Sequence, residues 1–141
     1  MAAAGTIRKG IRNSVKNLLE AKAGFLGTVQ VGKHYLPDIS ELPLTRIMTP
    51  VTERIKDNAD ATDLFIDLEL EHWAGETDAA SVDDLLDTMA DLGEEVILDT
   101  TETLGGLVFR VVAGPQAMAV DDSSENILGA LTASYTLHVI R

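Results

Sequence analysis

Three carboxylates and an imidazole lie close together in the middle of this sequence. Asp67, Glu69 and Glu71 alternate with apolar residues, and His72 follows the last of them. Convergent carboxylates beside a histidine are typical of general acid–base sites and of divalent-cation sites. Successive side chains of a strand point to opposite faces of its sheet, so this spacing places all three carboxylates on one face. The simpler interpretation is therefore a solvated sheet surface.

Other residue types that carry out catalysis occur without the spacing that catalysis requires. The chain has no cysteine, and its three histidines, His34, His72 and His138, lie in separate segments. No two histidines have the spacing of a metal site, and no serine lies in a nucleophile-elbow sequence. The sequence predicts no catalytic residue, no metal site and no cofactor, so we expect the protein not to be an enzyme.

Length and composition predict one domain. The chain has 141 residues, 45% of them hydrophobic, which suffices for a core without disulfide bonds. The absence of cysteine fits folding in a reducing cytoplasm. The first residues lack the apolar segment of a signal peptide, and no apolar run reaches the ~18 residues of a membrane span. We therefore expect a soluble product made inside the cell, with no membrane partner.

The formal charge of −12 is unevenly distributed along the chain. Residues 1–37 contain six of the 11 basic residues and one acidic residue, whereas the remaining residues contain five basic and 22 acidic residues. A body of this charge repels nucleic acid, which disfavours a general DNA-binding function. An acidic body with a basic end can instead bind other copies of itself head to tail.

Residues 3–22 have the periodicity of an amphipathic α-helix. Its apolar residues recur at steps of three and four: Ile7, Ile11, Val15, Leu18 and Leu19. A basic row lies beside this stripe and consists of Arg8, Arg12 and Lys16. This row can contact an acidic neighbour, or it can be a solvated flank whose long side chains lie along the helix.

The central segment predicts a strand followed by a helix. From residue 63 to 73, the face opposite the carboxylates is apolar: Leu64, Ile66, Leu68 and Leu70. Trp73 ends this strand, where it can close the edge of the core or anchor a partner. Apolar residues then recur at helical spacing over 82–92. Thr77 or Ser81 is the expected N-cap of this helix, and Ser81 with Asp84 matches a capping sequence.

The remaining segments complete the predicted fold. The glycine-rich stretch from Gly24 to Leu36 predicts a bent loop or short strand, and its pattern assigns it to no surface. Residues 42–51 predict a first strand, and 52–62 a polar connection. Residues 107–120 predict a strand with a bulge at Gly114–Pro115, and 127–140 a final strand paired with it. This order indicates an α+β fold: a mostly antiparallel four-stranded sheet with two helices packed on one face.

Taken together, these segments resemble a family of phage proteins. The resemblance rests on the opening helix Ile7–Leu19, Leu42–Pro43 before the first strand, the strand Leu64–Leu70, the helical segment Asp83–Asp87, Leu104–Gly106 and the closing strand Ala133–Ile140. Over nearly its whole length the chain resembles the tail terminators of long-tailed bacteriophages, of the minor tail protein U type.

This resemblance implies a structural role in the virion, at the junction of tail and neck. Such proteins form a hexameric ring that caps the tail tube, ends tube polymerisation and joins the tail to the neck or connector protein. It gives Asp67, Glu69 and Glu71 a role as channel-facing acids, past which DNA moves without specific binding. Arg8, Arg12, Lys16 and Trp73 become candidate residues of the subunit or ring interface.

Two alternatives remain open from the sequence. Neck and head-completion proteins of the same particles are also small, acidic and ring-forming, and they differ from a terminator in the partner that they bind. A small cytoplasmic ligand-binding or enzymatic domain is the other alternative, since α+β folds support many functions. A monomer with a deep apolar pocket would favour that interpretation.

Overall fold

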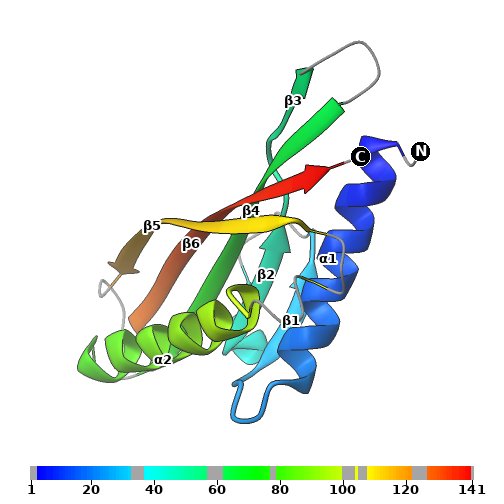
Figure 1. Ribbon diagram of the computed structural model, residues 1–141. Helices are drawn as coiled ribbons and strands as arrows, with labels where there is room; N and C mark the ends of the chain where they lie inside the picture. The colour runs from blue at the N-terminus through cyan, green and yellow to red at the C-terminus, as the bar shows by residue number, and fades with distance from the viewer. Residues whose placement is uncertain are drawn as a thin grey trace.

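The computed structural model describes residues 3–32, 37–56, 62–76, 79–99, 104, 108–121 and 127–140. The described residues form an α+β fold (Figure 1). Its elements follow in the order α1 (Ala4–Ala21), β1 (Thr28–Val31), the 3₁₀ helix η1 (Ile39–Glu41), β2 (Leu44–Met48), β3 (Thr52–Lys56), β4 (Thr62–Glu76), α2 (Ala79–Ile97), β5 (Arg110–Asp121) and β6 (Ile127–Ile140).

The strands of the described residues form one six-stranded mixed sheet. Its order is β1-β2-β4-β6-β5. β3 pairs with the first residues of β4, 62–66, on the same side of β4 as β2. All pairs are antiparallel except β1 with β2. The prediction of four strands is therefore too low. β1 is a short strand, one of the two possibilities predicted for the glycine-rich segment. The prediction that 52–62 is a polar connection is wrong for residues 52–56, because these residues form β3 by pairing with the start of β4.

The 15-residue strand β4 is the centre of the sheet. One edge of β4 pairs with β6 along almost its whole length, and the other edge is shared by β2 and β3 in succession. The predicted end at Trp73 is wrong, because pairing with β6 continues the strand to Glu76. Figure 1 shows β3 and the start of β4 extending beyond the rest of the fold.

Both helices cover the same face of the sheet, as predicted. The even-numbered residues Leu64, Ile66, Leu68 and Leu70 of β4 are fully buried under them. α1 packs on β1 and β2, α2 packs on β4 and β6, and the two helices contact each other. Neither α1 nor α2 covers the opposite face of the sheet, where η1 contacts the β1 end through the hydrogen bond from Gln30 to Glu41. We call this opposite face the open face.

The helices differ from their predictions only at their ends. α1 lies within one residue of the predicted bounds and buries Ile11, Val15 and Leu19. α2 begins at Ala79, so Ser81 lies inside its first turn and is not the N-cap, while Thr77 lies outside the described residues. The last turn of α2 ends at Ile97, which is buried in the core. Neither described helix combines the length and apolar character that a membrane span requires.

β5 and β6 form the predicted antiparallel pair at one edge of the sheet. The register shifts between Ala113 and Gln116, so the predicted bulge at Gly114–Pro115 is confirmed. The final strand has the predicted bounds. Nearly every residue of β5 is exposed, because α2 lies over β4 and β6 and leaves β5 uncovered.

The turn between α1 and β1 depends on glycine at one position in particular. Gly24 and Gly27 both have positive φ, of 81° and 85°. A Cβ at Gly27 would lie 2.1 Å from the Pro43 carbonyl oxygen, whereas a Cβ at Gly24 would have no atom within 4 Å. Any other residue would therefore suffer the same backbone strain at both positions, but only at Gly27 would its Cβ also clash with neighbouring atoms.

We predict that Gly27→Ala destabilises the protein far more than Gly24→Ala. Gly24→Ala adds only left-handed strain, of about 1 kcal/mol. Gly27→Ala adds a backbone clash that separates β1 from β2, and we expect a loss of about 3 kcal/mol or more. Urea unfolding of both variants measures the difference. Equal losses would show that the close approach of Gly27 to Pro43 carries no energetic weight.

Candidate functional site

The open face carries the three carboxylates that the sequence singled out. Asp67, Glu69 and Glu71 are half-buried on β4, and none of them lies among the core residues. Their register partners on β6 are hydroxyl residues: Thr136, Ser134 and Thr132. The predicted alternation is confirmed. The centre of the open face is therefore a polar surface of carboxylates and hydroxyl groups.

Glu71 belongs to a network that the sequence does not reveal. Arg46 of β2 lies opposite Glu71 in register, is 2% exposed, and has its Nη1 3.8 Å from Glu71 Oε1. The Trp73 indole Nε1 donates a hydrogen bond to the same Oε1. Arg46 and Trp73 thus fix the Glu71 carboxylate and partly balance its charge. The only signal for this network is an arginine in the middle of a strand that is otherwise mostly apolar.

His72 is separated from the carboxylates by the sheet. Its ring is fully buried on the helix-covered face, where Nδ1 lies 2.8 Å from Thr45 Oγ1 and Gly93 of α2 passes close to the ring. Burial lowers the pKa of His72 to about 4, so the imidazole is neutral at pH 7. An acid–base pair between His72 and these carboxylates, or a cation held by both, is therefore incompatible with the fold.

The basic row of α1 is anchored to the strand connection beside it. Arg8 Nη1 donates to Thr52 Oγ1 at 3.1 Å, and Arg12 Nη1 donates to Thr49 Oγ1 at 2.6 Å. Lys16 lies 3.6 Å from Glu20 on the exposed side of the same helix. A shallow cavity of about 530 Å³ adjoins Arg12 and is lined by Arg12, Val31, Gly32, Met48, Thr49 and Pro50. Arg12 therefore holds this connection and also reaches an open, solvent-accessible hollow.

A second histidine forms a cluster at the other end of the open face. His138 Nε2 lies 3.1 Å from Asp63 Oδ2, and its ring stacks on Phe65 at 4.5 Å between centroids. Phe109 meets His138 edge-on at 5.5 Å and is 65% exposed. The cluster is compact and mainly aromatic, and it places an apolar ring at the surface next to β5.

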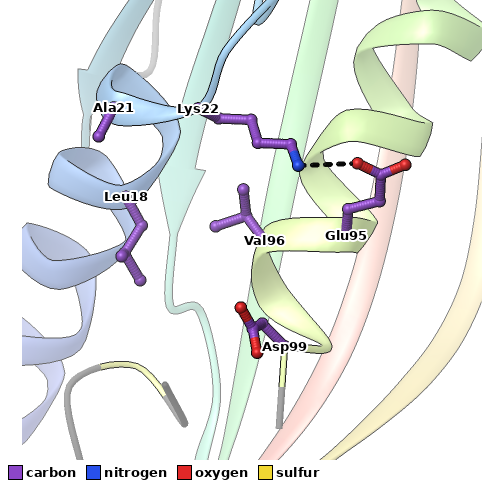
Figure 2. Close-up of a pocket in the computed structure, with 6 residues that line it drawn as sticks. All are labelled: Leu18, Ala21, Lys22, Glu95, Val96 and Asp99. Atoms are coloured by element: carbon purple, nitrogen blue, oxygen red, sulfur yellow. Dashed lines mark ion pairs between the residues drawn. The ribbon is translucent and has the colours of Figure 1, made fainter. Parts of the chain in front are cut away.

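A smaller cavity lies between the C-terminal ends of the two helices (Figure 2). It measures about 220 Å³, and Lys22 Nζ bridges the helices through Glu95 Oε2 at 2.9 Å. Figure 2 shows Leu18 of α1 and Val96 of α2 between the helices beneath this ion pair. Besides the Lys22–Glu95 pair, the lining consists of Asp99 and three small or apolar residues, Leu18, Ala21 and Val96, so we interpret the cavity as part of the helix junction.

The titratable side chains that the structure describes are dispersed over the two faces and the edges of the sheet. No group of three or more His, Asp or Glu side chains among them is placed to hold a metal ion. His34 lies in the segment Lys33–Leu36, which is outside the described residues. The features that remain are surfaces: the open face, the α1 flank, and the uncovered strand β5.

Comparison with known proteins identifies the fold. No protein-family model and no curated protein sequence matches this chain. Solved structures do match, and one of them is described as "Virion of native gene transfer agent (GTA) particle". A chain of that structure aligns over 99% of this chain and 100% of its own length, with a TM-score of 0.61 and 11% sequence identity. The similarity at this identity establishes a shared fold.

We predict that His72 makes the protein less stable in acid. The unfolded chain takes up a proton near pH 6.5, whereas the folded histidine resists protonation until about pH 4. Between these values the unfolded state binds more protons, so the free energy of unfolding falls as the pH falls, by about 3 kcal/mol at pH 4. Well above pH 6.5 the imidazole is neutral in both the folded and the unfolded state, so this loss of stability does not occur.

Denaturant unfolding of the wild type and of His72→Gln across pH 4–7 tests this prediction. The glutamine can keep a hydrogen bond to Thr45 but does not titrate. As the pH falls from 7 to 4, the free energy of unfolding of the wild type should therefore decrease by about 3 kcal/mol more than that of His72→Gln. Parallel stability curves would show that the buried imidazole has an ordinary pKa.

Proposed function

We propose that this chain is a structural protein of a phage-like virion, which assembles as a hexameric ring that caps the tail tube and joins the tail to the neck. The observation that carries the proposal is the full-length similarity of its fold to a virion chain. Among the described residues, no group of three or more His, Asp or Glu side chains is placed to hold a metal ion. The tail-terminator role itself is inferred from the sequence resemblance.

The open face suits the wall of a channel through which DNA passes. Asp67, Glu69 and Glu71 lie in one row along the strand direction, beside the hydroxyl groups of β6. A wall of carboxylates repels the phosphate backbone, and hydroxyl groups offer no cationic site that would retain it. In this assembly the helices lie outside the ring and the open face lies inside.

The α1 flank suits contact with a neighbouring subunit or ring. Arg12 is held by Thr49 at the edge of an open cavity, so its guanidinium is already positioned and loses little conformational freedom on binding. A carboxylate of an acidic neighbour fits such a site, since a guanidinium can donate two parallel hydrogen bonds to it. Arg8 and Lys16 extend the same positive flank, and Trp73 offers a half-buried aromatic on the open face.

The partner distinguishes a terminator from a neck protein. Purified protein carrying an affinity tag can be mixed separately with isolated tails and with DNA-filled heads. A terminator binds one end of the tails, and we expect that result. Stable binding to filled heads without binding to tails would instead identify a neck or head-completion protein.

We predict that Arg12→Glu reduces capping of tail tubes by about tenfold, because it reverses the charge presented to an acidic neighbour. The substitution also removes the hydrogen bond to Thr49, so Thr49→Val serves as the matched control. That variant loses the same hydrogen bond and keeps the charge. The fraction of capped tubes is counted by electron microscopy, and thermal unfolding checks that each variant folds.

If Arg12 acts on a neighbour, Thr49→Val caps tubes almost as well as the wild type while Arg12→Glu does not. Equal capping by the wild type and Arg12→Glu would exclude the α1 flank from the assembly. Equal losses in the two variants would assign Arg12 a role within its own subunit alone.

We predict that Glu69→Lys makes the assembled ring retain DNA. Lysine in every subunit would place positive charge on the channel wall, and we expect DNA affinity at low salt to rise by about tenfold or more. Asp91→Lys on the exposed side of α2 changes the net charge equally and serves as the control. A gel-shift assay with purified rings compares the two. Equal retention by both variants would show that net charge, and not the open face, determines the effect.

A further inference from the structure

The edge strand β5 has apolar side chains exposed on both faces. On the open face Val112 is 48% exposed, and on the other face Met118 and Val120 are 39% and 40% exposed. Phe109 precedes the strand and is 65% exposed. In the described part of the chain β5 pairs only with β6, so its outer edge is open. An open apolar edge is a template for pairing with another strand.

The strand register relates β5 to the opposite edge of the sheet. Continuous pairing links the four residues of β1, Thr28–Val31, through β2, β4 and β6 to residues 116–119 of β5. Thr28 lies on the row of Ala119, and Val31 lies on the row of Gln116. Both edges therefore offer four residues at the same level of the sheet. Pro115, which has no N–H to donate, lies outside this segment.

The strand directions also match. β5 runs opposite to β1 and to β3, as the successive pairings show. A rotation about an axis parallel to the strands keeps these directions unchanged. β5 of one subunit would therefore meet β1, the outermost strand of the next subunit, in the antiparallel sense. Such head-to-tail contacts close into a ring or continue as a filament.

Opposite charges lie at the two edges on one row of the open face. Pairing places Glu53 of β3 opposite Phe65, Phe65 opposite His138, and His138 opposite Arg110 of β5. Glu53 and Arg110 are both exposed. Three strand spacings separate them within one subunit, so the two charges cannot pair there. If β5 of one copy pairs with β1 of the next copy, Arg110 and the partner subunit's Glu53 lie on the same row, two strand spacings or about 10 Å apart. The long arginine and glutamate side chains can span this distance.

We propose that β5 pairs with β1 of a second copy of this chain, with Arg110 on the row of the partner subunit's Glu53 and within reach of it. This contact rests on the ring proposed above and specifies its lateral interface. It covers the apolar side chains of β5 and extends the sheet from subunit to subunit around the channel.

Charge exchange tests the pairing. Arg110→Glu and Glu53→Arg each place like charges together, and we expect each to weaken self-association by about tenfold. The double variant restores opposite charges and should return to within about threefold of the wild type. Analytical ultracentrifugation measures association, and circular dichroism confirms the fold. A double variant as weak as the product of the single effects would overturn the contact.

Cysteine cross-linking gives an independent measurement, because the chain contains no cysteine. Thr28→Cys protein is mixed with Ala119→Cys or Ala117→Cys protein and oxidised. We expect disulfide-linked pairs only in the mixtures. Met118→Cys, on the other face of β5, is the control and should not cross-link with Thr28→Cys.

The outcomes separate the contact from the proposed function. Rings that cap tails but give no cross-link overturn the contact and leave the function intact. Disulfide dimers from Ala119→Cys alone overturn it too, because they show β5 pairing with itself around a twofold axis. Specific cross-links in open filaments that do not cap tails support the contact and contradict the terminator function.

Discussion

The alternation of side chains along β4 is the constraint on which the structure depends. Its period of two sends Leu64, Ile66 and Leu68 into the core and Asp67 and Glu69 to the open face. A shift of one residue in register would exchange the two faces and bury carboxylates beneath the helices. Burying an unpaired carboxylate costs several kcal/mol, so the register has no competing alternative. The helix-covered core and the polar surface are therefore consequences of one pattern.

The pairing on both sides of β4 determines which strands form the two edges of the sheet. β6 occupies one edge of β4, while β2 and β3 divide the other, and α2 packs mainly on β4 and β6. The molecule is left with a face of carboxylates and hydroxyl groups and with a strand whose apolar side chains are uncovered. In the function that we propose, copies of the chain surround a channel, the polar face lines it and the uncovered strand contacts a neighbouring copy.

The sequence predicts the features of this structure that depend on local periodicity. α1, the core face of β4, the Gly114–Pro115 bulge and β6 follow from apolar spacing and from glycine and proline. β3 does not, because its mostly polar sequence has no apolar alternation and becomes a strand only by pairing with the start of β4. The same reason hides Arg46, whose ion pair with Glu71 arises from pairing of β2 with β4. Of the candidate residues, the carboxylates lie on the predicted face, whereas the contacts of the basic row within its own subunit required the tertiary structure.

Electron microscopy of the purified protein mixed with tail tubes measures the proposed role most directly. If the chain assembles through its surfaces around a channel, each tube carries a closed ring of this protein at one end, and the ring has an open centre. Tubes with bare ends beside a monomeric protein, at concentrations at which both are intact, would contradict the assembly role of these surfaces.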